Sequence, residues 1–262
     1  MKLSLHDIDD KEKGKIGLLI AHGPSLEKDI QRIFELSLQK EKFSTFTTGE
    51  AKILENMGFN FQLDYWTIAN TDFTVAKNYS DINKYEKVKF LYAEAVDKSP
   101  NPESVLKVDF IPYDQRHFSE QNCVKNWKPG DSNYSSSGYY YCCANKPEDF
   151  FVGKQTLQEY VQTKCSFDKH YSTASTSALH MLATAIITGC KEIYLFGVDL
   201  DYSIGYADGK TTNNDSFSPY IKEIIDDFKI LNDSAKNIGI KIYNMSFSSP
   251  LASIFDTIEF TL

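Results

Sequence analysis

The distribution of apolar and polar positions predicts a chain in which strands alternate with helices. Residues 16–21 are apolar except for one glycine, as expected for a buried strand, and apolar residues then recur at helical spacing from 26 to 38. Further strands are predicted in "KFSTFTTG", "FQLDYWTIANTD", "KVKFLYAEAV", "SVLKVDFIPY", "KEIYLFGV" and "IKIYNMS". Helices are predicted in "EAKILENMG", "PEDFFVGKQTLQEYVQTKC", "STSALHMLATAIITG", "FSPYIKEIIDDFKILNDSAKNIG" and "SPLASIFDTIEF". This alternation predicts an α/β fold with a mostly parallel sheet and helices on both faces.

A long irregular segment interrupts this pattern at about 114–165. It contains a Pro-Gly pair, a serine run and clustered tyrosines, and it predicts a surface excursion in which residues 139–143 return as a strand. Segments of this kind are either functional lids or ordinary insertions, and both interpretations stay open. We expect one domain over residues 1–262 with this lid-like excursion inserted.

The charge and the cysteine content of the chain limit which binding partners and which cellular compartment we expect. The chain has 262 residues, 42% of them hydrophobic, and a net charge of −8, so a nucleic-acid backbone is excluded as a partner. The five cysteines are odd in number and show no metal-binding spacing, which favours reduced thiols. The polar opening residues lack a signal-peptide pattern, and no run of about 18 apolar residues occurs. We expect a cytoplasmic protein, with contact to the inner face of the membrane left open.

Polar residues follow several predicted strands, at the edge where open parallel sheets bind ligands. The clusters are residues 22–25, 47–49, 70–72, 199–206 and 244–249. "GPSL" has a glycine that lets a ligand approach and a serine suited to capping the next helix, although a plain strand-to-helix junction would look the same. Five hydroxyl residues between 172 and 178 mark a second helix start that could hold a phosphate or a carboxylate. Together the clusters predict a common polar cleft.

The segment that follows "KEIYLFGV" concentrates titratable groups. Strand alternation would place Asp199 and Asp201 on one face, where they could hold Mg²⁺ or Mn²⁺ against a nucleotide diphosphate. Alternatively, Asp199 accepts hydrogen bonds from a ribose or from loop amides while Asp201 is solvated. Tyr202 and Tyr206 either donate protons to a leaving phosphate or pack against the loop.

Three segments carry a resemblance to a known family. "LLIAHGPSL", "STSALHMLATAIITGCKEIYLFGVDLDY" and "IKIYNMSFSSPLASIFDTIEF" resemble, in the same order, motifs of the bacterial sialyltransferases of glycosyltransferase family 42. The same pattern is also similar to a wider group that includes the motility accessory factors and the 6-hydroxymethylpterin pyrophosphokinases. The resemblance implies a Rossmann-like fold with a lid and CMP-sialic acid as the donor.

The resemblance also implies roles for single residues. Gly23 and Ser25, with His22 where the family has asparagine, would lie by the donor phosphate, and Asn70 would contact the donor. Thr176 and Ser177 would hold the sugar carboxylate or the phosphate, Asp199 would lie by the ribose, and Tyr202 and Tyr206 would stabilise the departing phosphate. The histidine base of the family is absent near "SPYIKEI", which leaves Glu223 and, from the excursion, His117 as candidate bases.

These observations lead to one functional hypothesis and two alternatives. We expect transfer of a sialic acid or a sialic-acid-like sugar from a CMP-activated donor to a bacterial surface glycan, with no required metal or other cofactor. The first alternative is a pyrophosphokinase-like enzyme using ATP and Mg²⁺ at Asp199 and Asp201, and the second is a non-catalytic nucleotide-binding relative. The expected partners are the sugar donor and a glycan acceptor, with a homo-oligomer left open.

Overall fold

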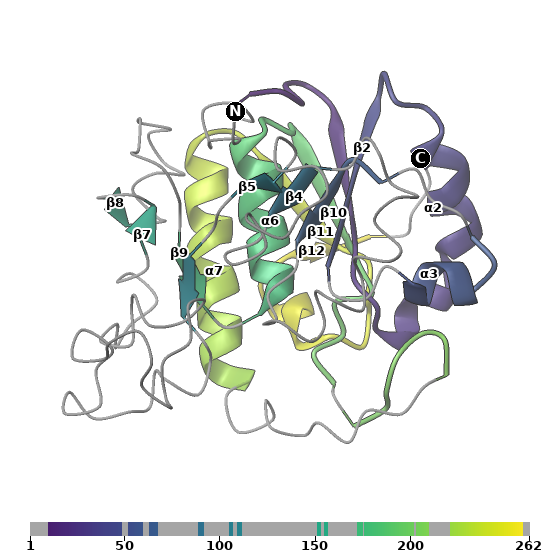
Figure 1. The fold of residues 1–262 in the computed structure, drawn as a ribbon. Helices are drawn as coiled ribbons and strands as arrows, with labels where there is room; N and C mark the ends of the chain where they lie inside the picture. Colours follow the sequence, from purple (N-terminus) through teal and green to yellow (C-terminus); the bar gives the residue numbers. More distant parts are fainter. Residues whose placement is uncertain are drawn as a thin grey trace, which may run out of the picture.

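The computed structural model has an eight-stranded sheet at its centre (Figure 1). It describes residues 10–48, 52–59, 63–67, 89–91, 105–106, 109–111, 151–152, 155–156, 172–174, 176–201, 203–209 and 221–258. The strands of the sheet are β1 (Ile16–Ile20), β2 (Phe43–Thr48), β3 (Tyr65–Thr67), β4 (Lys89–Leu91), β5 (Val105–Leu106), β10 (Glu192–Phe196), β11 (Lys241–Asn244) and β12 (Asp256–Thr257). Every neighbouring pair is parallel, which confirms the predicted α/β, Rossmann-like class.

The order of the strands creates a switch point in the middle of the sheet. The spatial order is β12-β11-β10-β1-β2-β3-β4-β5. From β1 the chain adds strands outward on one side, and it later returns to the other side of β1 to add β10, β11 and β12. The connections that leave β1 and β10 therefore diverge, and a crevice between the carboxyl ends of these two strands follows from the topology.

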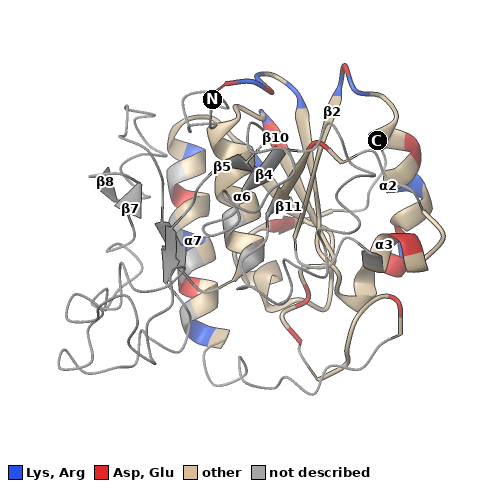
Figure 2. Cartoon of the chain, viewed as in Figure 1, with Lys and Arg blue, Asp and Glu red and all other residues tan. Residues whose placement is uncertain are grey.

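Helices cover both faces of the sheet, as the alternation of elements predicts. Leu19 of β1 packs in one apolar cluster with α6 (Ser177–Ile187) and α7 (Ile221–Asn237). Leu18 packs in a second cluster with α2 (Ile30–Ser37) and α3 (Lys52–Asn56). Figure 1 shows α6 and α7 on one side of the sheet and α2 and α3 on the other. Charged residues gather on the helices and connecting loops around tan central strands (Figure 2).

Local signals explain where α6 begins and ends. The Thr176 side chain accepts a hydrogen bond from Leu179 N at 3.2 Å and so caps the first turn. The helix stops before Gly189, whose φ of +87° is the left-handed conformation typical of helix ends. The segment before β1 then satisfies the free carbonyls: Glu12 N donates to Thr188 O at 2.7 Å, and Gly14 N donates to Gly189 O at 3.2 Å. None of the helices in the described residues is both long and apolar enough to cross a membrane.

The helix cap expected at Ser25 and the helix expected at 147–165 were both wrong. The predicted cap Ser25 lies inside a 3₁₀-helix, η1 (Pro24–Lys28), whose cap is Gly23, and α2 starts separately after Asp29. The Ser25 side chain is instead engaged by another element, as described below. In the predicted helix at 147–165, the structure has an antiparallel pair, β7 (Phe151–Val152) and β8 (Gln155–Thr156). A glycine-lysine pair joins them in the sequence, which is a hairpin signal that outweighs weak helical periodicity.

Other predictions also need correction or fall outside the described residues. "SVLKVDFIPY" forms two strands, β5 and β6 (Asp109–Ile111), and β6 pairs with β9 (Ser172–Ala174), which was expected at the start of a helix. The predicted final helix is a short 3₁₀-helix, η9 (Pro250–Ser253), followed by edge strand β12. Apart from β7 and β8, the excursion at 114–165, with the strand expected at 139–143, lies outside the described residues.

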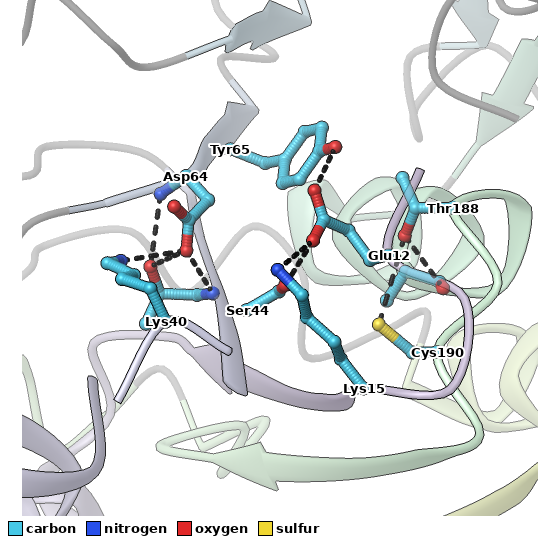
Figure 3. Close-up of polar contacts among 10 residues, drawn as sticks. Glu12, Lys15, Lys40, Ser44, Asp64, Tyr65, Thr188 and Cys190 are labelled. Atoms are coloured by element: carbon cyan, nitrogen blue, oxygen red, sulfur yellow. Dashed lines mark hydrogen bonds and ion pairs between the residues drawn. The ribbon is translucent and has the colours of Figure 1, made fainter. Parts of the chain in front are cut away.

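A polar network holds the segment before β1 against the amino ends of the strands (Figure 3). The Glu12 carboxylate accepts hydrogen bonds from Ser44 Oγ at 2.7 Å and from Tyr65 OH at 2.9 Å, and it forms an ion pair with Lys15 at 2.8 Å. These partners belong to β2, β3 and the leader to β1, so one carboxylate connects three neighbouring segments. Nearby, burial raises the pKa of the Cys190 thiol to about 12, which keeps it protonated and matches the expectation of a free thiol.

This network predicts an acid-sensitive contribution to stability. Burial alone raises the pKa of Glu12, but the bonds from Lys15, Ser44 and Tyr65 bring it below its ordinary value of 4.5. A carboxyl group with a depressed folded pKa stabilises above the unfolded pKa, and the contribution disappears as pH falls through the folded pKa. We expect Glu12→Gln to lower the free energy of unfolding by about 1 kcal/mol at neutral pH.

Urea unfolding at neutral pH and at several values below 4.5 measures this effect. The difference in the free energy of unfolding between wild type and Glu12→Gln should become smaller as the pH falls. The exposed Glu41, changed to glutamine, provides the control and should alter stability little at any pH. If this difference in free energy is constant over the whole pH range, the charge of Glu12 does not contribute to stability.

Candidate functional site at the carboxyl edge of the sheet

The segments that follow β1 and β10 lie in close contact at the switch point. Beyond the strands, Ala21 N donates to Phe196 O at 2.9 Å, and Gly23 N donates to Gly197 O at 2.8 Å. A Cβ atom at position 23 would lie 2.4 Å from Asp199 Oδ2 and 2.6 Å from Gly197 O. Both distances are too short for any side chain, so this approach of the two turns requires a glycine.

Asp199 joins three loops at this edge. Its side chain is only 6% exposed, and its Oδ2 accepts a hydrogen bond from Ser25 N at 2.8 Å. Its Oδ1 accepts hydrogen bonds from the hydroxyl groups of Ser25 and Ser246. Ser25 follows β1, Asp199 follows β10 and Ser246 follows β11, so one buried carboxylate holds together the ends of three adjacent strands. Such charge-assisted hydrogen bonds are the stronger class.

The loop after β11 is itself held in place by local hydrogen bonds. Asn244 Nδ2 donates to Ser246 O at 2.6 Å, and Ser246 N donates to Asn244 Oδ1 at 3.2 Å. Ser249 Oγ donates to Val198 O at 2.8 Å and also caps η9. These bonds orient the Ser246 hydroxyl toward Asp199 before any ligand arrives. The sequence marks residues 244–249 as a polar strand end, but nothing in it identifies Ser246 as a partner of Asp199.

Asp201 is arranged quite differently from Asp199. Strand β10 ends at Phe196, and Leu200 has a φ of +55°, so strand alternation does not apply and the expected shared face is not formed. Asp201 is exposed, and its carboxylate accepts hydrogen bonds from Ser203 Oγ at 2.6 Å and Ser203 N at 3.0 Å. These hydrogen bonds lower the pKa of Asp201, and the bond from the Ser203 side chain has the larger effect. Among the described residues, no group of three or more acidic, histidine or cysteine side chains is positioned to hold a metal.

His22 is buried beside the same turn, with 6% exposure. Its Nε2 lies 3.3 Å from Thr47 Oγ1, and the Thr47 hydroxyl donates its hydrogen to Ile20 O at 2.8 Å. The histidine tautomer that fits this contact therefore carries its proton on Nε2. His22 O accepts a hydrogen bond from Ala207 N at 2.8 Å, which folds the loop of Tyr206 back toward β1. Tyr206 is 43% exposed there, with a phenol in contact with solvent.

The start of α6 lies at the same edge, because this helix runs antiparallel to the strands and its last turn leads directly into β10. Thr176 uses its side-chain oxygen as the helix cap, and Ser177 is the first helical residue. Thr48, at the end of β2, has a buried Oγ1 with no hydrogen-bond partner. Thr47 is paired with Ile20, whose side chain packs on the face of the sheet that α2 covers. Because successive side chains of a strand point to opposite faces, Thr48 points to the face that α6 covers. Residues 47–49 were predicted as a polar strand end, but no signal in the sequence distinguishes Thr48 from its neighbours.

The remaining expected site residues are placed only in part. Glu223 lies in the first turn of α7, and the position of its side chain is not described. Tyr202, Asn70 and His117 lie outside the described residues, so their roles stay predictions. The structure thus brings together His22, Gly23, Ser25 and Asp199, while the arrangement of the expected bases and of one tyrosine remains a hypothesis.

Comparison with known proteins gives a distant likeness only. No protein-family model and no curated protein sequence matches the chain. A crystal structure of the sialyltransferase CST-II, in complex with a trisaccharide acceptor and CMP, is similar with a TM-score of 0.44 and 18% identity, covering 94% of this chain and 86% of that one. A mutant of the α-2,3/8-sialyltransferase CstII has a TM-score of 0.41 and 18% identity, covering 94% and 87%. The resemblance to the wider group stays a prediction.

The bonding of the two carboxylates predicts very different effects of their removal. Asp199→Ala would leave one part-buried amide and two hydroxyl groups without their acceptor, so we expect a loss of about 2 kcal/mol in the free energy of unfolding. Asp201→Ala is the matched control, because this exposed carboxylate bonds only within its own turn and should change stability by less than about 0.5 kcal/mol. Urea unfolding of both variants tests this. Equal losses would contradict the assignment of Asp199 as the link between the loops.

Proposed function

We propose that the chain is a glycosyltransferase that transfers a sialic acid or a sialic-acid-like sugar from a CMP-activated donor to a surface glycan. The supporting observation is the link between Ser25 and Asp199 across the switch point. Two of the three segments that carry the family resemblance supply these residues: Ser25 follows β1 in "LLIAHGPSL", and Asp199 follows β10 in "KEIYLFGVDLDY". The carboxyl edge at a switch point is the usual ligand site of open parallel sheets.

In this proposal the edge of the sheet binds the nucleotide part of the donor. The glycine at position 23 lets the backbone approach the ligand, and the free amide groups at the start of α6 attract the phosphate. The phenols of Tyr202 and Tyr206 stabilise the phosphate that leaves as the bond to the sugar breaks. Asp199 acts mainly as a positioning residue, because its oxygens already hold Ser25 and Ser246 in the shape against which the ribose lies.

The acceptor hydroxyl needs a base, and two candidates remain. Glu223 lies on a long helix, so its backbone is held by packing, and Ile224 beside it is fully buried. His117 belongs to the excursion and would reach the site only if that segment closes over it. We propose Glu223 as the base, with His117 as the alternative. The scheme requires no metal, and contacts with a membrane surface or between copies of the chain are further proposals.

Nucleotide preference is the direct test of the proposed donor. We expect CMP or CDP to raise the melting temperature more than ATP does, without added metal, because a ligand that binds only the folded state stabilises it by RT ln(1 + L/Kd), where L is the concentration of free ligand, so the tighter ligand has the larger effect at equal concentration. Thermal unfolding with CMP, CDP, UDP and ATP, each with and without Mg²⁺, measures this. A larger effect of ATP with Mg²⁺ than of any cytidine nucleotide would favour the pyrophosphokinase alternative instead.

The base is tested by two substitutions that remove the basic group but keep a polar side chain. We expect Glu223→Gln to lower the rate of transfer from a CMP-activated sugar by about 10²-fold or more while CMP binding is retained, because removal of a general base slows the chemical step on this scale. His117→Asn is assayed in parallel and should keep its rate. The opposite result would assign the base to His117. If wild type transfers no CMP-activated sugar to any member of a broad acceptor panel, the chain is not the proposed transferase.

A further inference from the structure

A large aromatic side chain is exposed beside the buried carboxylate of the candidate site. Phe247 is 58% exposed and directly follows Ser246, whose hydroxyl group binds Asp199. The large hydrophobic side chains exposed among the described residues are Leu38, Ile204, Tyr206 and Phe247. All except Leu38 lie in the loops that follow β10 and β11, at the carboxyl edge of the sheet. Single exposed hydrophobic residues are common, but this concentration at the edge of a polar site is informative.

A lysine from a different element holds the ring of Phe247. Lys28, the last residue of η1, has its Nζ 4.7 Å from the centroid of the Phe247 ring. The same ammonium group donates a hydrogen bond to Met245 O at 3.0 Å. A cation at this distance is attracted to the face of an aromatic ring. The lysine therefore lies on one face of the ring and at the same time ties η1 to the loop after β11.

The backbone that carries the ring is also fixed on both sides. Met245 is 2% exposed, and its N donates to Leu195 O at 3.0 Å. Ser249 is 3% exposed and is bonded through Oγ to Val198 O. Phe247 thus extends toward solvent from a short loop anchored at both ends on β10 and its continuation. A ring held in this way loses little conformational entropy when it binds a flat partner.

We propose that Phe247 is the stacking platform for the nucleobase of the ligand, with Lys28 holding the ring from its other side. This inference rests on the proposed function, since it takes a nucleotide as the ligand of the site. The ribose would lie against the Asp199 link, and the residue next to Ser246 is placed to meet the base attached to that ribose. Aromatic side chains stack on the π-face of any base, so the platform provides affinity for the base while selectivity among bases comes from other groups.

Two ligands that differ only in carrying a nucleobase or not can distinguish the loss of stacking from a general distortion of the site. Calorimetry measures the Kd of CMP and of ribose 5-phosphate for wild type, Phe247→Ala and Phe247→Tyr. We expect Phe247→Ala to weaken CMP binding by about ten-fold or more, the usual effect of removing one stacked aromatic ring. Ribose 5-phosphate binding should be unchanged in this variant. Phe247→Tyr keeps the ring and should keep the affinity for CMP.

Two further variants and the possible contrary results complete the test. Lys28→Met removes the cation but keeps an aliphatic chain and should weaken CMP binding less than Phe247→Ala does. Leu38→Ala removes an equally exposed side chain far from the site and should change neither Kd. If Phe247→Ala leaves the Kd of CMP unchanged, or weakens both ligands equally, the stacking role is wrong while the proposed function stands. If wild type binds neither CMP nor ribose 5-phosphate, the proposed nucleotide site fails and the stacking role fails with it.

Discussion

One buried carboxylate determines the shape of the carboxyl edge of this protein. Asp199 accepts hydrogen bonds from Ser25 N and from the hydroxyl groups of Ser25 and Ser246, and so it joins the chain segments that follow β1, β10 and β11. A charged group with 6% exposure is tolerated only when hydrogen bonds replace the water that it has lost. Because the donors come from the segments that follow β1 and β11, satisfying the carboxylate also fixes those segments. The geometry of the candidate site is thus a consequence of a desolvation requirement.

At the opposite, amino edge of the sheet, another carboxylate is also satisfied by several hydrogen-bond donors, and there it anchors the segment before β1. Glu12 binds Ser44, Tyr65 and Lys15, which anchors the segment before β1 to the amino ends of β2 and β3. The backbone of this segment also satisfies the carbonyl groups at the end of α6. The start of α6, which we propose as part of the phosphate site, therefore belongs to a helix whose other end is held firmly. The amino edge provides a rigid scaffold, and the carboxyl edge presents polar and aromatic groups to solvent.

Some features of the site were accessible to sequence reasoning and others were not. The glycine at position 23 and the carboxylate at 199 follow strongly apolar strands, so their place at the carboxyl edge could be predicted. The separation of Asp199 from Asp201 could not, because it depends on where β10 ends and on a positive φ at Leu200. Ser246 and the pair of Lys28 with Phe247 were also missed. Ser246 lies 47 positions from Asp199, and Lys28 lies 217 positions from Met245, and contacts over such separations leave no local signal.

By itself the sequence determined the elements whose hydrophobic pattern is long and regular. The strands β1 and β10 follow from burial on both faces of the sheet, which demands nearly continuous apolar strands. Their alternation with the apolar helix α6 and the amphipathic helix α7 indicates the parallel α/β class. Only the tertiary structure decided the strand order, which sets the switch point between β1 and β10. It also decided that Ser25 serves Asp199 and does not cap a helix, because a buried charge attracts the nearest donors whatever their local preference. Local periodicity records burial, whereas the pairing of distant polar groups is fixed only once the chain has folded.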